Sequence, residues 1–140
     1  MKSIWKTSGD APTFPSLQGD TTTDVLIIGG GIVGILTAHF LRERGVSYLL
    51  VEKGRICSGT TGNTTAKITA QHGLCYHKLL RQSGVGIAKA YLQANRAAAE
   101  QFALLCREID CDFAHKDNFV YATTDRKKLE DEMEALTKLG

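Results

Sequence analysis

The sequence is poor in residues that interrupt or cross-link a chain. It has two prolines in 140 residues, and both come before residue 16. No proline therefore breaks a helix or strand in the rest of the chain. The four cysteines, Cys57, Cys75, Cys106 and Cys111, form no CxxC pair and lack the spacing of a secreted disulfide framework. They indicate reduced thiols, and we expect a cytoplasmic protein.

The sequence also lacks strong charge and long apolar runs. A net charge of +2 is too small and too dispersed to indicate binding to nucleic acid or to an anionic membrane. The most apolar stretch, 25–41, contains four glycines and His39, so no membrane span is expected. The first 20 residues lack the pattern of a signal peptide. His72, Cys75 and His77 match no zinc spacing, so no metal site is expected. A small-molecule substrate remains the expected partner, and the oligomeric state stays open.

What the sequence does contain is a glycine-rich turn between two apolar runs. Val25–Ile28 is too short for a helix and predicts a buried parallel strand. Gly29 permits a tight turn, Gly31 lets the backbone approach a pyrophosphate, and Gly34 lets the next helix pack close to the sheet. Apolar residues then recur at helical spacing until Gly45, which is placed to end the helix. Tyr48–Val51 predicts a second buried strand.

Glu52 follows this second strand, about 20 residues after the glycines, where a dinucleotide-binding unit places an acid. A carboxylate at this point accepts hydrogen bonds from the ribose hydroxyls and would repel a 2′-phosphate. The pattern favours FAD or NAD over NADP. A glycine-rich turn in some other α/β protein is the alternative.

The next segment, 54–67, reads GRICSGTTGNTTAK and is rich in Gly, Ser and Thr. Such a stretch offers many backbone N–H groups and hydroxyls to a long cofactor, although a solvated loop has the same composition. Here the chain resembles the glycine/D-amino-acid oxidase-like family of FAD-dependent oxidoreductases. The resemblance rests on DVLIIGGGIVGILTAHFLRERGVSYLLVEKGRICSGTTGNTTAKIT and extends more loosely to Gly140.

The resemblance implies FAD as the cofactor and gives each matching position a role. Gly29, Gly31 and Gly34, with Ile32 and Val33 of the first helical turn, would hold the pyrophosphate. Glu52 would bind the adenosine ribose, and Lys53 would lie by the adenine. The pyrophosphate and ribityl chain would be lined by Thr60, Thr61, Gly62, Asn63 and Thr64. Ala66 and Lys67 would approach the isoalloxazine, where a cation stabilises anionic reduced flavin. Residues 53–71 contain no His, which implies a non-covalent flavin.

Beyond this unit we expect an extended N-terminal arm (1–22) with Trp5 and Phe14, an FAD-binding segment (23–83), and a helical segment that begins the substrate domain (84–140). A helix should begin near Tyr76, break at Gly84 and Gly86, and resume over 87–108. Asp112–His115 and Phe119–Thr123 predict a short β-hairpin. Asp125 should cap a last helix, Arg126–Leu139, whose charges form a solvated face.

The predicted fold class is α/β: a Rossmann-like βαβ unit with a parallel sheet, then helices and the short hairpin. Members of the family run to several hundred residues, so we expect an N-terminal fragment of a two-domain flavoprotein. The whole enzyme would transfer a hydride from a carbon next to an amine, in an amino acid or similar molecule, to flavin. Its catalytic residues would lie beyond Gly140, and the 140 residues alone should bind FAD weakly and show no turnover. An NAD-binding dehydrogenase, another dinucleotide oxidoreductase and a non-catalytic nucleotide-binding fragment are the alternatives.

Overall fold

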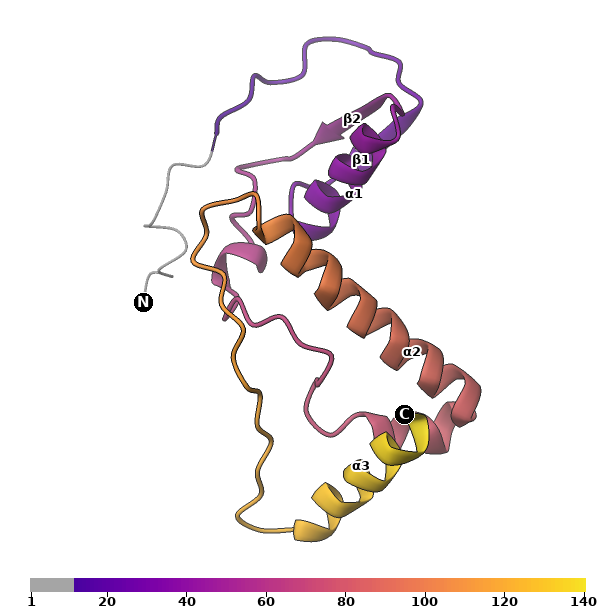
Figure 1. The fold of residues 1–140 in the computed structure, drawn as a ribbon. Helices are drawn as coiled ribbons and strands as arrows, with labels where there is room; N and C mark the ends of the chain where they lie inside the picture. The colour runs from indigo at the N-terminus through magenta and orange to yellow at the C-terminus, as the bar shows by residue number, and fades with distance from the viewer. Residues whose placement is uncertain (1–11) are drawn as a thin grey trace. The chain divides into compact units, whose positions relative to one another are not determined.

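The computed structural model describes residues 12–140, which divide into two compact units at Ala66 and Lys67. Trp5 lies outside the described residues. The first unit contains a parallel strand pair, one α-helix and a short 3-10 helix, and the second contains two longer α-helices (Figure 1). In chain order the elements are β1 (Val25–Ile28), α1 (Ile32–Glu43), β2 (Tyr48–Val51), the 3-10 helix η2 (Thr61–Asn63), α2 (Tyr76–Cys106) and α3 (Arg126–Leu139). The division falls earlier than the domain boundary expected after residue 83, which stays a prediction.

The strand, helix and strand predicted for the first unit are present. β1 and β2 pair in parallel, with Val25 opposite Tyr48 and Ile28 opposite Val51. The N–H of Gly29 donates to the carbonyl of Val51 over 2.8 Å, so the ladder continues into the glycine turn. Parallel pairing requires a crossover connection, and α1 supplies it.

The prediction that both strands are buried is wrong for most of β1 and for β2, whose four residues are only partly buried. Only Ile27 is buried, whereas Leu26 is 53% exposed and Ile28 is 81% exposed. A strand of a parallel sheet is buried when helices cover both faces of the sheet. Within the described part of this unit, two strands and one helix cannot cover both faces, so apolar side chains remain in contact with water.

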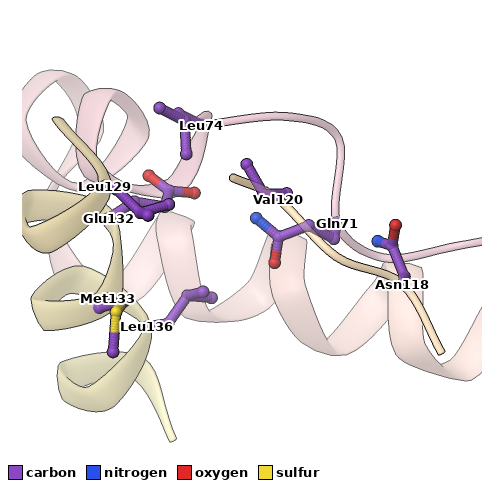
Figure 2. Close-up of a pocket in the computed structure, with 8 residues that line it drawn as sticks. All are labelled: Gln71, Leu74, Asn118, Val120, Leu129, Glu132, Met133 and Leu136. Atoms are coloured by element: carbon purple, nitrogen blue, oxygen red, sulfur yellow. The ribbon is translucent and has the colours of Figure 1, made fainter. Parts of the chain in front are cut away.

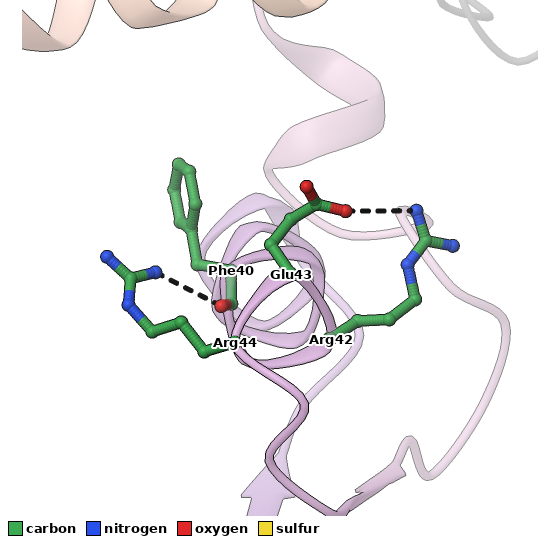
Figure 3. Close-up of polar contacts among 4 residues, drawn as sticks. All are labelled: Phe40, Arg42, Glu43 and Arg44. Carbon is green, nitrogen blue, oxygen red and sulfur yellow. Dashed lines mark hydrogen bonds and ion pairs between the residues drawn. The ribbon is translucent and has the colours of Figure 1, made fainter.

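α1 ends at Glu43, and Gly45 stops it two residues later, as the sequence predicts. Gly45 has a φ of 66°. Its N–H donates to the carbonyl of Arg42, and the N–H of Val46 donates to the carbonyl of Leu41, each over 3.0 Å. This pair of bonds is a Schellman motif, which glycine favours because it lacks a Cβ. Figure 3 shows a side-chain contribution at the same end: Arg44 Nη1 donates to the Phe40 carbonyl over 3.1 Å. Arg42 and Glu43 make an exposed ion pair of 3.8 Å there.

In the second unit, α2 packs against α3. The core consists of Tyr76, Ala88 and Leu92 from α2 with Ala135 and Leu139 from α3. The predicted interruption of the long helix lies at Gly84, whose φ of 77° and ψ of 173° are not helical. Helical geometry resumes after this residue, so Gly86 does not break the helix.

One carboxylate of α3 is buried, contrary to the prediction that the charges of 126–138 are solvated. Glu132 is 2% exposed. Its two oxygens accept hydrogen bonds from the backbone N–H groups of Tyr76 (2.8 Å) and His77 (2.7 Å). The first N–H groups of a helix have no partner within the helix and favour negative charge. Glu132 therefore caps α2 from 55 residues away and joins the two helices.

Two other predictions for this unit need correction. The segments Asp112–His115 and Phe119–Thr123 form no strands. An isolated two-stranded hairpin is marginal in water, and here Asn118 bonds Thr69 over 3.1 Å instead of closing a turn. Asp125 precedes α3 but its side chain makes no capping bond, since its carboxylate pairs with Lys128 at 2.5 Å.

Candidate cofactor-binding site

The turn between β1 and α1 has a shape that only glycine allows. Gly29 adopts a φ of 109°, a region closed to residues with a Cβ. A Cβ on Gly34 would lie 2.0 Å from the carbonyl oxygen of Gly29 and 3.3 Å from Ile27 Cγ2. Both roles, the tight turn and the close approach of helix to strand, are the ones predicted for these glycines. Together they place the start of α1 directly at the end of β1.

The first turn of α1 has unpaired backbone donors and contains no acidic residue. Gly31 precedes the helix in an extended conformation, makes no side-chain cap, and no acidic residue lies in the first turn. Among the described residues, no side chain accepts from the N–H groups of Val33 or Gly34. Unpaired N–H groups and the positive end of the helix dipole favour an anion such as a pyrophosphate.

Glu52 reaches back from the end of β2 to this turn. Its Oε2 accepts from the N–H of Gly30 over 2.8 Å, and its Oε1 accepts from the N–H of Gly54 over 2.9 Å. These two bonds, the one from Gly30 first, hold the pKa of Glu52 below its ordinary value. The side chain is therefore ionised at neutral pH and held in a fixed orientation beside the glycine turn.

The loop after Glu52 folds over the same turn. The N–H of Cys57 donates to the Gly30 carbonyl over 2.9 Å, and the N–H of Ile32 donates to Thr61 Oγ1 over 3.0 Å. A Cβ on Gly30 would lie 2.8 Å from Ile56 Cγ2. The loop thus contacts the turn at three points and brings Thr61 to the N-terminus of α1.

The other predicted site residues lie along this loop. Gly62 of η2 is buried, and Asn63 Nδ2 donates to the Gly59 carbonyl over 2.7 Å. Ala66 has a φ of 55°, a conformation that is uncommon for a residue with a side chain. The exposed members of the predicted set are Ile32, Val33, Lys53, Thr60, Asn63, Thr64, Ala66 and Lys67. Lys67 begins the second unit, and its approach to a flavin stays a prediction.

Sequence reasoning missed two residues that build this site. Gly30 contributes an N–H to Glu52 and a carbonyl to Cys57, and Gly54 contributes the second N–H to Glu52. The run of three glycines at 29–31 was the available signal for Gly30. The fingerprint accounts for only the first and third of them.

A hollow lies in the second unit, between α3 and the segments around Gln71 and Asn118 (Figure 2). Its volume is about 200 Å³, and Leu74, Val120 and Met133 are among its apolar lining residues. Glu132 is the acidic residue of the lining, but both its oxygens are bonded to α2. The hollow therefore offers no carboxylate oxygen without a partner. Among residues 12–140, no cluster of three His, Cys, Asp or Glu side chains is arranged to hold a metal ion.

Comparison with known proteins identifies the family. The family model described as FAD dependent oxidoreductase (DAO) matches residues 24–140, from the residue before β1 to the end of the chain. The chain belongs to this family of FAD-dependent oxidoreductases. FAD is therefore the cofactor, as the resemblance to the glycine/D-amino-acid oxidase-like family led us to expect. No solved structure matches the chain significantly.

Three curated proteins that are similar in sequence to this chain carry different functional names. YhfW of Bacillus subtilis (strain 168), which carries the name of a Rieske 2Fe-2S iron-sulfur protein, is 43% identical over 99% of this chain and 28% of its own length. A glycerol-3-phosphate dehydrogenase of Synechocystis sp. (strain ATCC 27184 / PCC 6803 / Kazusa) is 44% identical over 39% of this chain and 10% of its own. The Baeyer-Villiger monooxygenase peniC of Penicillium patulum is 38% identical over 36% and 8%. The chain spans less than a third of each relative's length.

The donor set of the site fits the adenosine diphosphate half of FAD. The N-terminus of α1 offers N–H groups to phosphate oxygens, and the open space at Gly29, which has no atom within 4 Å of a notional Cβ, leaves room for them. Glu52 supplies an ionised acceptor for hydroxyl groups.

Within the described residues, no helix is both long and apolar enough to cross a membrane.

Proposed function

We propose that the chain forms the FAD-binding portion of an oxidoreductase that removes a hydride from a carbon next to an amine, in an amino acid or a related small molecule. The observation that carries the cofactor half of this proposal is the bond of 2.8 Å between Glu52 and Gly30, which fixes a carboxylate beside a glycine turn. When bound, FAD supplies the chemistry by accepting the hydride, and the protein supplies binding, orientation and electrostatics.

Glu52 can bind a ribose without giving up its present partners. Each carboxylate oxygen has two lone pairs, and each accepts one backbone N–H in the structure. The second lone pair of each oxygen is available to a ribose hydroxyl. We therefore propose that Glu52 holds the ribose while Gly30 and Gly54 hold Glu52. The same negative charge would disfavour a 2′-phosphate.

Thr61 gives the loop a direct role at the pyrophosphate. Its Oγ1 accepts the N–H of Ile32, so its hydroxyl proton remains free to donate. We propose that this proton bonds a phosphate oxygen held by the N–H groups of Val33 and Gly34. Thr60, Gly62, Asn63 and Thr64 would continue along the ribityl chain, with Lys53 at the adenine.

The amine substrate is supported by the resemblance to glycine and D-amino-acid oxidases. In this proposal Lys67 approaches the pyrimidine side of the flavin with Ala66, and its positive charge stabilises the reduced cofactor. The side chains that orient the substrate would belong to parts of the whole protein outside these 140 residues. The chain alone is then expected to bind FAD weakly and to show no turnover.

The relative YhfW favours a second candidate for the electron acceptor of the reduced flavin. It is 43% identical over 99% of this chain, and its name is that of a Rieske iron-sulfur protein. We propose as the alternative that the whole protein passes electrons from its flavin site to an iron–sulfur cluster instead of to oxygen. The proposed amine substrate is the same whether the flavin passes its electrons to an iron–sulfur cluster or to oxygen.

One experiment tests the proposal in two steps. The complete protein is purified, its visible spectrum is recorded, and FAD is sought in the supernatant after denaturation. Flavin bands and released FAD are expected, and their absence would refute a flavoprotein. The flavin is then mixed anaerobically with glycine, D-amino acids and simple amines. Bleaching by one of them supports amine oxidation, whereas bleaching only by compounds without nitrogen would contradict it. Readmitting oxygen and assaying peroxide separates the two electron acceptors.

A further inference from the structure

Gly30 is buried between the stem of Glu52 and the loop that follows it. A Cβ added to Gly30 would lie 2.8 Å from Ile56 Cγ2 and 3.2 Å from Glu52 Cβ. The methyl group Cγ2 of Ile56, a partly buried side chain, therefore packs against the backbone of Gly30 on the side where other residues carry a Cβ. Gly30 is held by contact on this side, and a larger residue would push Ile56 or Glu52 away.

The two backbone polar groups of Gly30 are bonded to the same stretch of chain. Its N–H donates to Glu52 Oε2 over 2.8 Å, and its carbonyl accepts the N–H of Cys57 over 2.9 Å. A rotation that turned the N–H of Gly30 away from Glu52 would also strain the bond to Cys57. The same rotation would press the Gly30 backbone against Ile56. The loop after β2 therefore holds in place the donor that orients the carboxylate.

A tight turn brings both of these loop contacts to Gly30. The N–H of Ser58 donates to the Arg55 carbonyl over 3.3 Å and closes a turn with Ile56 and Cys57 at its centre. Cys57 has a φ of 55°, a left-handed conformation that is uncommon for a residue with a side chain. The turn thus presents the Ile56 methyl group and the Cys57 N–H, from consecutive residues, to one glycine.

On the basis of the proposed contact between Glu52 and the ribose, we infer that Ile56 is a positioning residue that determines how strictly the site excludes a 2′-phosphate. Ile56 holds Gly30, which in turn holds Oε2 of Glu52. The N–H of Gly54 holds Oε1 over 2.9 Å. A carboxylate held at both oxygens cannot turn aside. It faces a ribose hydroxyl as an acceptor and a 2′-phosphate as a like charge, so the same group favours one ligand and rejects the other.

Release of Gly30 by the loop would take one fixed partner from the carboxylate of Glu52. The carboxylate could then turn away from a phosphate group, and it would present its lone pairs less well to a hydroxyl group. Binding of a ligand with a free 2′-hydroxyl should weaken, while binding of the corresponding 2′-phosphate should strengthen. A general loosening of the loop would instead weaken both ligands alike. The ratio of the two affinities therefore reports on the position of the acid.

Substitutions of Ile56 separate the position of its methyl group from its bulk. Valine lacks Cδ1 but keeps Cγ2, the atom that packs against Gly30. Leucine has as many carbons as isoleucine but has no branch at Cβ, so it lacks Cγ2. Alanine lacks all the outer carbons. We therefore expect Ile56→Leu and Ile56→Ala to lose selectivity against the 2′-phosphate, and the conservative variant Ile56→Val to restore it.

The experiment compares two ligands that differ only in the 2′-phosphate. The complete protein is freed of FAD and titrated by calorimetry with ADP-ribose and with ADP-ribose 2′-phosphate. Wild type should prefer ADP-ribose. Ile56→Leu and Ile56→Ala should reduce this preference about tenfold, since residues in direct contact are coupled in their effects. Ser58→Ala, which changes an exposed side chain of the same loop, is the matched control and should keep the preference of wild type.

The outcomes distinguish the role of Ile56 from that of Glu52. If wild type binds no ADP-ribose, or binds both ligands equally, the proposed role of Glu52 is wrong and that of Ile56 is wrong with it. If wild type prefers ADP-ribose but Ile56→Leu keeps the preference, or weakens both ligands by the same factor, the role of Ile56 alone is wrong. Loss of the preference in Ile56→Val would also overturn it. Ile56→Leu conserves volume, so the test holds even where Ile56→Ala does not fold.

Discussion

The carboxylate of Glu52 and the backbone N–H of Gly30 are joined by a hydrogen bond of 2.8 Å across 22 residues of sequence. The bond links the end of β2 to the turn between β1 and α1, the two places where a dinucleotide-binding unit needs an acid and a close backbone approach. A second bond from Gly54 fixes the other oxygen of the same carboxylate. The acid is therefore oriented before any cofactor binds, and the ordering of this side chain adds little to the cost of binding.

The first prediction concerns the affinity for FAD. In the complete protein, Glu52→Gln should weaken FAD binding on the order of ten- to a hundredfold, because charge-assisted hydrogen bonds to the ribose are replaced by weaker ones. The measurement is a titration of apoprotein with FAD followed by flavin fluorescence. Glu43→Gln is the control, since Glu43 is exposed at the far end of α1 and pairs with Arg42. Equal affinity of Glu52→Gln and wild type would show that the acid does not bind the ribose.

The second prediction concerns the pH dependence of the hydrogen bonds that Glu52 accepts. The N–H of Gly30, and then that of Gly54, lowers the pKa of Glu52 in the folded protein from an ordinary value of 4.5. A lowered pKa means that the contact contributes stability above the unfolded value, and that this contribution is lost as pH falls through the folded value. The amide signals of Gly30 and Gly54 should therefore titrate together below pH 4.5 in NMR spectra. A shared midpoint above that pH would contradict the assignment.

The sequence was enough to predict the first unit because its signals are local. The spacing of Gly29, Gly31 and Gly34, followed by Gly45, determines a turn, a helix and its end within 20 residues. What could not be predicted was burial. Whether Ile28 is covered depends on layers that pack on β1 from elsewhere, and periodicity says nothing about which layers are present.

The second unit shows the same limit in another form. In the sequence, Glu132 is one of many charged residues of this helix. It lies three, four and seven residues before Ala135, Leu136 and Leu139, so helical spacing places it on the same face, which packs against α2. An acid on an apolar face was the available signal, but its partner is a helix N-terminus 55 residues away. The β-hairpin predicted over 112–123 is absent for a related reason. The composition of 112–123 favours strands, but strands need partners, and the sequence does not show that Asn118 bonds Thr69.

The third prediction concerns this buried acid. Glu132→Gln should destabilise the second unit by about 1–3 kcal/mol, since an amide offers one acceptor oxygen to two helix N–H groups. Glu132→Ala should cost more, because it leaves both N–H groups of Tyr76 and His77 without a partner. Urea unfolding followed by far-ultraviolet circular dichroism measures the difference. Glu134→Gln, two residues away on the exposed face of α3, should change the midpoint very little. A Glu132→Gln variant as stable as Glu134→Gln would contradict the capping role.

The fourth prediction compares two glycines of α2 that lie two residues apart. Gly84 has a φ of 77° and a ψ of 173°, a combination that a residue with a Cβ avoids. Gly86 is helical and has open space around a notional Cβ. Gly84→Ala should therefore destabilise the chain by about 1–3 kcal/mol, whereas Gly86→Ala should stabilise it by up to about 1 kcal/mol. Thermal unfolding of both variants checks the signs. If both moved in the same direction, the kink at Gly84 would not be a fixed feature of the helix.

The last prediction concerns Gly34, where α1 approaches β1 most closely. A Cβ there would lie 2.0 Å from the Gly29 carbonyl oxygen, and that atom is backbone, so no side-chain rotation relieves the overlap. Either α1 moves away from the strand or the turn at Gly29 is lost, and both displace the N–H groups of Val33 and Gly34 from the position proposed for the pyrophosphate. Gly34→Ala should therefore destabilise the first unit by about 2–4 kcal/mol and abolish measurable FAD binding in the complete protein. Hydrogen exchange at the strand amides of Leu49–Val51 reports on this unit alone and should become faster. Gly59→Ala is the matched control, because Gly59 lies in the same unit with nothing within 4 Å of a notional Cβ. Unchanged exchange and unchanged FAD affinity in Gly34→Ala would mean that the close approach of helix and strand is not what positions the site.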